Sequence, residues 1–321
     1  MMETLLEVTD LKKHFKTKSG LFGKKTESVK AVDGVNFKIY KGEAFGLVGE
    51  SGSGKTTIGQ TILRMHEKTS GKVIFKDVDI HSLNKKDLKN LRPKIQYIFQ
   101  DPYSSLNPRI RIGDAIGEPL LEHGMATKDD VNEKVEEILN MCGLGTYYID
   151  RYPHEFSGGQ RQRIVIARAM ALSPEFIVAD EPVSSLDVSI QAQIINLFSD
   201  LQEQKGVSYL FISHDLSVVE HLCSRIAIMY LGTIVELATR DELFSNPFHP
   251  YTKALLSAIP VPDPTLKRNR IILRGDIPSP SNPPKGCKFH TRCPYVKGIC
   301  SKKNPEFREV SEGHEVACHL V

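Results

Sequence analysis

The sequence predicts an α/β fold built on parallel strands. Three short apolar runs, residues 43–49, 175–180 and 208–213, have the composition of buried strands. A polar turn and a helical pattern follow each of them, and strands that alternate with helices favour a parallel sheet. The carboxyl ends of such strands carry the ligand groups. No internal repeat is found, so the chain carries one copy of this arrangement.

The composition is that of a globular protein of 321 residues, with 40% hydrophobic and 25% charged residues. Lys and Arg number 42 against 39 Asp and Glu, and a net charge of +3 does not argue for a nucleic-acid partner. No apolar run reaches the length of a membrane span, and acidic residues interrupt the N-terminal stretch that a signal peptide would need. We therefore expect a cytosolic protein, in a compartment where stable disulfides are rare.

Three further segments differ from the alternating pattern. Residues 5–41 alternate apolar and polar side chains, which predicts an antiparallel β layer, although the cationic stretch 16–30 within it is expected to be a solvated loop. A mostly helical insertion covers about 101–172. Pro, Gly and Ser dominate 275–286, which excludes a helix or a central strand there. We expect a main domain over 1–240 and a cysteine-rich extension over 241–321.

A phosphate-binding loop connects the first apolar strand to the helical pattern after it. The stretch "GESGSGKTT" matches G-x-x-x-x-G-K-[ST] in the strand–loop–helix context that this motif requires. Its glycines let successive N–H groups face phosphate oxygens, and the helix adds the positive end of its dipole. Lys55 is expected to reach the β and γ phosphates of ATP, and Thr56 to bind Mg²⁺. The predicted nucleotide-binding residues are Gly49, Glu50, Ser51, Gly52, Ser53, Gly54, Lys55, Thr56 and Thr57.

Two carboxylates follow the second apolar strand, in "FIVADEP". Asp180 ends this strand, where it is placed to hold Mg²⁺, and Glu181 is placed to polarise the attacking water. The alternative is that both are ordinary charges at the end of a strand. With a phosphate-binding loop in the same chain, the metal and catalytic roles are favoured.

The stretch "FSGGQRQR" resembles the LSGGQ signature of the ATP-binding cassette (ABC) family. It lies in the helical insertion ahead of "ADEP", which is the family's order. Phe156 stands where the family usually has leucine, and Ser185 where it often has alanine; neither change removes a ligand group. Three further motifs are similar to the family's Q-loop, D-loop and switch histidine: Gln100 in "YIFQDP", Asp187 in "SSLD" and His214 in "FISHD".

This resemblance implies a role for each motif. Gln100 would bind Mg²⁺ and link it to the helical subdomain, His214 would contact the γ-phosphate, and Phe15 would stack on adenine. The family works as a head-to-tail dimer, so the signature residues of one chain would act on the ATP of its partner. Their backbone N–H groups, at the start of a helix, suit a second anion site. These signature residues are Ser157, Gly158, Gly159 and Gln160.

The stretches "YPHEFSGGQRQRI", "EPVSSLDVSIQAQI" and "IPSPSNPPKGC" resemble the ATPase subunits of bacterial oligopeptide and dipeptide importers. The resemblance implies an ATP-hydrolysing subunit at the cytoplasmic face of the membrane, where it pairs with a second ATPase, identical or paralogous. The partners would be two permeases and, indirectly, an external peptide-binding protein. Residues 100–120 would form part of the groove for a permease helix. The whole extension is covered by this resemblance.

Three alternatives remain open at this point. Relatives of this type also carry nickel or other small solutes, and the ATPase does not itself contact the solute. A soluble cassette ATPase acting on ribosomes or DNA usually has two cassettes or a long coiled-coil insertion, and this chain has neither. A regulatory or redox module, with incidental ATP binding, would have only the cysteine-rich tail as support.

Four of the six cysteines lie in the last 35 residues: Cys287, Cys293, Cys300 and Cys318. The spacing C-x5-C-x6-C lacks the close pair of cysteines that structural zinc sites usually show, while four thiolates on loops can hold a [4Fe–4S] cluster. The resemblance implies such a cluster as a cofactor beside ATP and Mg²⁺, with zinc or no metal as alternatives. His290, His314 and His319 are expected at the surface, and Cys142 and Cys223 in the core.

Overall fold

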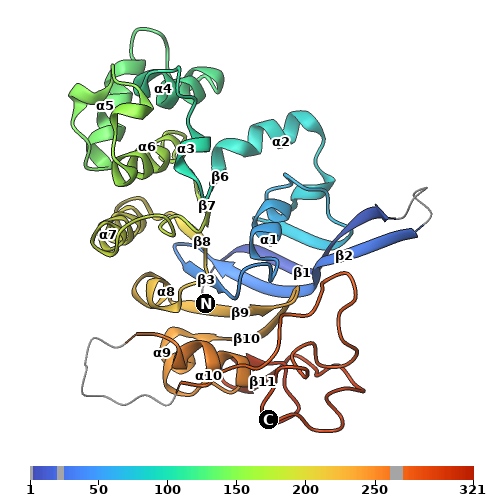
Figure 1. Cartoon of the computed structure of the whole chain (residues 1–321). Helices are drawn as coiled ribbons and strands as arrows, with labels where there is room; N and C mark the ends of the chain where they lie inside the picture. The colour runs from blue at the N-terminus through green and yellow to red at the C-terminus, as the bar shows by residue number, and fades with distance from the viewer. Residues whose placement is uncertain (1–2, 20–24, 261–269) are drawn as a thin grey trace. The chain divides into compact units, whose positions relative to one another are not determined.

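The computed structural model describes residues 3–19, 25–260 and 270–321 (Figure 1). The chain forms two compact units, which are described separately below. The first unit comprises Met1–Tyr40, Phe45–His81 and Ser213–Val321, and the second comprises Lys41–Ala44 and Ser82–Ile212. Among the described residues, no helix combines the length and the apolar character that a membrane span requires.

An antiparallel sheet opens the first unit, as the alternating sequence predicts. Its strands run in the order β2-β1-β4-β5. The expected loop over 16–30 is wrong on both sides of its tip, because the two long strands continue to pair there: Lys16 faces Ser28 and Ser19 faces Lys25. The tip itself lies outside the described residues. The strands are β1 (Thr4–Ser19), β2 (Lys25–Tyr40), β4 (Ser70–Phe75) and β5 (Val78–Asp79).

A second set of strands in the first unit runs in the order β11-β12-β10-β9-β3. Here β3 and β9 pair in parallel, and the remaining pairs are antiparallel. The strands are β3 (Ala44–Val48), β9 (Arg225–Tyr230), β10 (Thr233–Thr239), β11 (Arg308–Ser311) and β12 (His314–Val316). The helices of this unit are α1 (Lys55–Ile62), α8 (Leu216–Leu222), α9 (Arg240–Ser245) and α10 (Pro250–Ser257), with a short 3-10 turn at Ile80–Ser82.

Parallel strands form the core of the second unit, in the order β8-β7-β6. Every residue of β7 and β8 is buried, which explains their near-continuous apolar sequences. These strands are β6 (Ile95–Ile98), β7 (Phe176–Asp180) and β8 (Ser208–Ser213). The helices are α2 (Lys85–Leu91), α3 (Pro102–Ser105), α4 (Ile112–Glu122), α5 (Val131–Met141), α6 (Gly158–Met170) and α7 (Val188–Lys205), with 3-10 turns at Arg92–Lys94, Thr146–Tyr148 and Pro153–Glu155.

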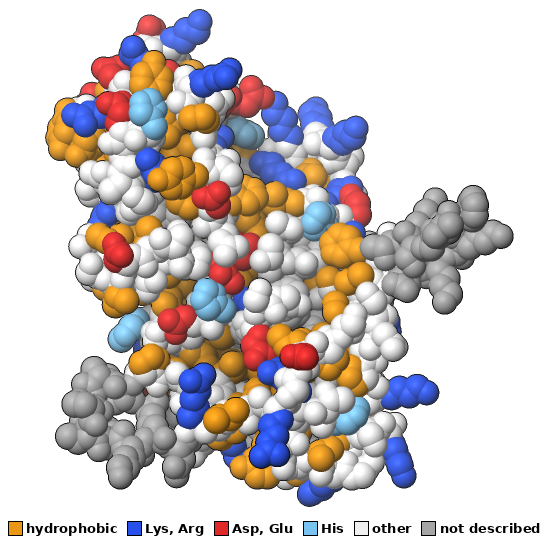
Figure 2. Space-filling model, in the orientation of Figure 1, with side chains coloured by type: hydrophobic (Ala, Val, Ile, Leu, Met, Phe, Trp, Pro, Cys, Tyr) orange, Lys and Arg blue, Asp and Glu red, His pale blue; other side chains and the backbone are white. Residues whose placement is uncertain are grey.

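The helices of the second unit differ in how much they bury. Helices α4, α5 and α6 pack on one another, each through an apolar stripe, and lie together in Figure 1. Helix α2 buries no residue. Lys and Arg side chains gather over it (Figure 2), and Lys85, Lys86 and Lys89 are exposed there. This basic cluster is therefore the solvated face of a short polar helix.

The extension begins within the first unit and continues its sheet. Strand β12 pairs with β10, with Val316 opposite Glu236. Glu236 is fully buried and accepts hydrogen bonds from the backbone N–H groups of Phe248 (2.7 Å) and His249 (3.1 Å), at the start of α10. The His314 ring lies 2.8 Å from Glu236 and is 0% exposed, so the expectation of a surface histidine is wrong there. A buried carboxylate requires such partners, which sequence spacing does not reveal.

His249 makes the stability of this unit depend on pH. Burial lowers the pKa of His249 to about 4, while its Nδ1 accepts the N–H of Tyr251 at 3.1 Å. Between pH 6.5 and 4 the unfolded chain therefore binds a proton that the folded chain does not. We expect the free energy of unfolding to fall with decreasing pH in this window, by about 1.4 kcal/mol per pH unit.

The matched variant is His249→Asn, which keeps an acceptor for the helix N-terminus and removes the titrating ring. Thermal unfolding followed from pH 7 to pH 5 should give a smaller loss of midpoint temperature for this variant than for the wild type. Equal losses for the two proteins would show that His249 does not carry the pH dependence.

Candidate functional site

The phosphate-binding loop lies between β3 and α1, as predicted. Lys55 is only 4% exposed, and its ammonium group donates to the carbonyl oxygens of Gly49 (2.7 Å) and Glu50 (3.2 Å). The amine is thereby held inside the loop, at the N-terminus of α1. Thr56 is exposed beside it. A loop of N–H groups, a buried cation and a helix N-terminus form an anion site suited to a polyphosphate.

Gly54 caps helix α1 in a conformation that only glycine adopts easily. Its φ is +106°, and a Cβ there would lie 2.1 Å from the carbonyl oxygen of Ala31. The loop thus packs directly on the backbone of β2. Gly52 also has a positive φ (+77°), but a Cβ there would meet nothing within 4 Å.

Ser53 supplies an independent sign that the loop is built for a ligand. Its hydroxyl is buried and has no hydrogen-bond partner among the described residues. A buried polar group without a partner costs free energy, which a bound phosphate oxygen would recover. The backbone of Ser53 is fixed, because its carbonyl accepts the N–H of Gly232 at 2.8 Å. The loop therefore fits the phosphates of ATP.

The predicted carboxylates lie in the second unit, at the carboxyl end of β7. Asp180 is 3% exposed, and Tyr97 donates its hydroxyl to this carboxylate at 2.7 Å. Glu181 follows with a φ of +47°, an uncommon conformation for a residue other than glycine, and such backbone strain concentrates at functional sites. The amide of Gln100 donates to the Glu181 carboxylate at 3.0 Å. Residues 81 positions apart in the chain are thus brought together, as a shared site requires.

The signature opens helix α6 through a capping box. The Ser157 hydroxyl accepts the N–H of Gln160 at 3.4 Å, and the Gln160 side chain accepts the N–H of Ser157 at 3.0 Å. Gln160 also donates to the hydroxyl of Tyr148 at 3.3 Å. These bonds hold the signature backbone at the helix N-terminus, where its dipole favours an anion.

Asp187 is exposed at the N-terminus of α7, which is the place expected of the D-loop. The loop before it is held by Gln191, whose side-chain amide donates to the carbonyl oxygens of Val183 (3.0 Å) and Leu186 (2.9 Å). The D-loop is therefore a fixed turn that presents Asp187 outward.

Phe15 and His214 both lie in the first unit and are accessible. Phe15 is half-buried on β1 rather than enclosed in the core. Its ring contacts the His66 ring edge to face at 5.4 Å, and the ammonium of Lys13 lies 4.7 Å from its centroid. His214 is exposed directly after β8. Accessible rings suit contacts with a nucleotide.

Two residues that bond to the site residues were not predicted from the sequence. Tyr97, which fixes Asp180, lies on β6 in register with β7, so strand pairing could have suggested it. Arg292 forms an ion pair with Glu50 of the phosphate-binding loop, at 2.7 Å, across 242 positions of the chain. No local pattern reveals a pairing over that separation.

The four cysteines of the extension gather without forming a coordination site. Burial, reinforced by the neighbouring Cys318, Cys300 and Cys293, raises the pKa of Cys287 to about 11. All four remain thiols. In residues 3–19, 25–260 and 270–321, no group of three or more His, Cys, Asp or Glu side chains is arranged to hold a metal ion. The predicted cluster therefore does not fit these side chains as they stand. Cys142 and Cys223 are buried, as expected.

Two known families match this chain, one within the main domain and one largely within the extension. The family described as "ABC transporter" matches residues 32–184, and the one described as "Oligopeptide/dipeptide transporter, C-terminal region" matches residues 235–300. The second match begins within strand β10 and covers the linker and the first three cysteines of the extension.

Similar proteins match over their whole length. The oligopeptide transport ATP-binding protein AppF of Bacillus subtilis is 56% identical, over 99% of this chain and 98% of the relative. The oligopeptide transport ATP-binding protein OppF of Salmonella typhimurium is 50% identical, over 99% and 97%.

Solved structures agree on the fold. The dimeric ABC transporter cassette MJ0796 matches with a TM-score of 0.65 and 28% identity, over 74% of this chain and 99% of that one. The same values hold for its post-hydrolysis state bound to ADP and Pi. The cassette fold, the phosphate-binding loop and the full-length identity to transport ATPases together show that the chain is an ATPase of the ABC transporter family, in the branch that carries the oligopeptide/dipeptide transporter C-terminal region.

Proposed function

We propose that this ATPase powers the import of dipeptides or oligopeptides through an ABC transporter. One observation carries the proposal: the C-terminal region described for oligopeptide and dipeptide transporters follows the ATP-binding cassette in the same chain. Relatives at 50–56% identity over nearly the full length bear names of oligopeptide transport. The alternative cargo is nickel or another small solute.

Hydrolysis is assigned to residues of the phosphate-binding loop and of the later motifs. Lys55 neutralises charge on the β and γ phosphates, Glu181 polarises the attacking water, and His214 contacts the γ-phosphate. Mg²⁺ would be held by Thr56, Asp180 and Gln100, and when bound it supplies positive charge to the phosphates. The bond from Gln100 to Glu181 supports this assignment, since it orients the carboxylate. Phe15 stacks on adenine.

The active state is a head-to-tail dimer with a second ATPase subunit, identical or paralogous. The signature residues Ser157 to Gln160 then present their helix N-terminus to the ATP of the partner. Asp187 lies exposed, as a residue at such an interface would be. The related cassette MJ0796 has been solved as a dimer.

A groove in the second unit is the proposed seat of a permease helix. It has a volume of about 520 Å³ and lies along α4 and the start of α5. Its lining includes the apolar residues Ile110, Leu121 and Val131 and the acidic residues Asp114, Glu118 and Glu122. This chemistry suits an amphipathic helix with basic residues. The protein would thereby lie at the cytoplasmic face of the membrane as a peripheral subunit.

Leu121→Asp tests this groove. Leu121 is 41% exposed, so the change should leave the fold intact. We expect co-purification with the permeases to fall about tenfold or more, because a charge would replace apolar contact area at the centre of the interface. ATP binding should be unchanged. Leu121→Met, which keeps the apolar contact, should assemble like the wild type. Normal assembly of Leu121→Asp would place the permease contact elsewhere.

The proposed function is tested by reconstituting the chain with its second ATPase, the two permeases and the binding protein in liposomes. ATPase activity should rise when the binding protein is loaded with peptide, and should not rise with Ni²⁺. Stimulation by Ni²⁺ alone would reassign the cargo. Failure to associate with any permease, together with salt-sensitive co-purification with ribosomes, would favour a soluble cassette ATPase.

The four-thiolate [4Fe–4S] site remains a separate proposal with a structural role. Its support is that the chain folds back between two of these cysteines, since the backbone N–H of Cys287 donates to the carbonyl oxygen of Cys300 at 2.8 Å. Side chains would have to move to reach a shared metal. Iron and sulfide analysis of anaerobically purified protein tests it. Colourless protein that contains zinc or no metal would exclude the cluster.

A further inference from the structure

The extension contacts the phosphate-binding loop at Glu50. Arg292, next to Cys293, donates to both carboxylate oxygens of Glu50, at 2.7 and 3.2 Å. The Arg292 side chain is 8% exposed and that of Glu50 28%. A bidentate pair so well shielded from water holds its geometry better than an exposed one.

The backbone of Glu50 is held as well. The hydroxyl of Tyr251, on α10, accepts the N–H of Glu50 at 2.9 Å. The carbonyl of Glu50 accepts a bond from Lys55 at 3.2 Å. The extension thus bonds the carboxylate and the backbone N–H of Glu50. The carbonyl of Glu50 is bonded by Lys55, the residue expected to contact the phosphates.

An aromatic cluster keeps these partners in place. Phe289 is 1% exposed, and its ring contacts those of Tyr230 and Tyr251 at 5.2 and 5.3 Å. Buried rings in edge contact lock their rotamers, so Tyr251 and the backbone near Arg292 have little freedom.

A second set of hydrogen bonds links the extension to the phosphate-binding loop at Ser53. Lys288 donates to the Asp33 carboxylate and to the carbonyl of Leu231, both at 3.0 Å. Gly232, the next residue, donates its N–H to the carbonyl of Ser53 at 2.8 Å. The extension therefore supports the loop near its start and near its end.

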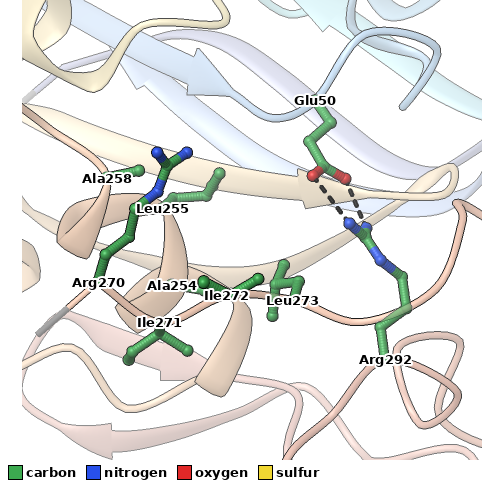
Figure 3. Close-up of a pocket in the computed structure, with 9 residues that line it drawn as sticks. All are labelled: Glu50, Ala254, Leu255, Ala258, Arg270, Ile271, Ile272, Leu273 and Arg292. Atoms are coloured by element: carbon green, nitrogen blue, oxygen red, sulfur yellow. Dashed lines mark hydrogen bonds and ion pairs between the residues drawn. The ribbon is translucent and has the colours of Figure 1, made fainter.

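A cavity of about 460 Å³ lies beside the ion pair (Figure 3). The pair forms one side, and α10 and residues 270–273 form the other. Without the guanidinium, the Glu50 side chain would have room to turn into this space. The position of Glu50 therefore depends on Arg292 rather than on tight packing.

We propose that Arg292 is a positioning residue for ATP binding: through Glu50 it orders the phosphate-binding loop, so that nucleotide affinity depends on the cysteine-rich extension. This inference rests on ATP binding by the cassette and not on the transported solute. Its test is therefore independent of whether peptides are imported.

The test measures equilibrium binding of a fluorescent ATP analogue, N-methylanthraniloyl-ATP, with Mg²⁺ to the full chain. Arg292→Ala should raise Kd about 5- to 20-fold, in the range of typical coupling between linked sites. In the assembled transporter, KM for ATP should rise similarly with a smaller change in kcat, because the hydrolytic groups are untouched. Arg292→Lys, which keeps the charge and loses the bidentate geometry, should lie between wild type and Arg292→Ala.

A double-mutant cycle separates this role from a general effect on folding. Glu50→Ala should raise Kd as Arg292→Ala does, and the double variant should add little, because both changes break the same link. Arg270→Ala is the matched control. Arg270 lines the same cavity, is exposed and lies apart from Glu50 in Figure 3, so Kd should stay at the wild-type value.

Two results would overturn the proposal. One is a Kd for Arg292→Ala within twofold of the wild-type value; the other is an additive effect of the two single changes. If Arg292→Ala does not fold, as judged by thermal unfolding, Arg292→Lys decides the question. A wild-type Kd for that folded variant would reject the positioning role.

Discussion

Glu181→Gln should abolish ATP hydrolysis while ATP binding persists. The substitution keeps an oxygen that accepts the bond from Gln100, now at 3.0 Å, and therefore keeps the local geometry. It removes the negative charge that polarises water. We expect kcat to fall by about 10²- to 10⁴-fold, the usual contribution of a general base. In the proposed head-to-tail dimer each ATP would lie against the signature residues of the partner, so the variant should also accumulate as an ATP-bound dimer.

The measurement is phosphate release by the assembled transporter, with nucleotide binding assayed in parallel. Glu175→Gln is the matched control, since Glu175 precedes the same strand β7 at its opposite end. It should hydrolyse ATP at the wild-type rate. A Glu181→Gln variant that retained a tenth or more of wild-type activity would remove Glu181 from the catalytic role.

Gly54→Ala should strongly weaken nucleotide binding. Its new Cβ would lie 2.1 Å from the carbonyl oxygen of Ala31, so the loop and the start of α1 must shift away from β2. The alanine would also carry the cost of a positive φ, about 1 kcal/mol or more. A displaced loop cannot aim its N–H groups and Lys55 at the phosphates. We expect ATP affinity to fall about 100-fold or more, as for other displaced polar sites.

Gly52→Ala is the control within the same loop. It carries a similar backbone cost, with a φ of +77°, but its Cβ meets nothing within 4 Å. Its ATP affinity should change by less than about tenfold, since only the strain of about 1 kcal/mol acts. Equal losses in the two variants would mean that backbone conformation, rather than contact with Ala31, governs the loop.

Local patterns predicted the elements that carry the proposed ATP-site residues. The strand before the phosphate-binding loop, the strand that ends at Asp180 and the strand before His214 all form where continuous apolar runs stand between turns. Such runs are strong signals because a strand in a parallel sheet is buried on both faces. The helix start at the signature was also predicted, and the capping box found there joins Ser157 to Gln160, three residues on.

Contacts between distant segments could not be predicted in this way. The pairs Glu50–Arg292 and Glu236–His314 join residues that are far apart in sequence. Taken alone, each of these polar residues would be expected at the surface. The need for a partner arises because the fold buries these groups, and the sequence alone does not show that burial. The loop expected over 16–30 failed for a related reason: cross-strand pairing extends β1 and β2 despite the high charge of the segment.

Uptake of a labelled peptide into vesicles measures whether this ATPase powers peptide import. Vesicles would contain the permeases, this chain and its second ATPase, with ATP at the ATPase face and loaded binding protein on the other. We expect uptake that requires ATP, stops with Glu181→Gln and continues with Glu175→Gln. Absence of uptake by the assembled wild-type transporter, or uptake that persists without hydrolysis, would contradict it.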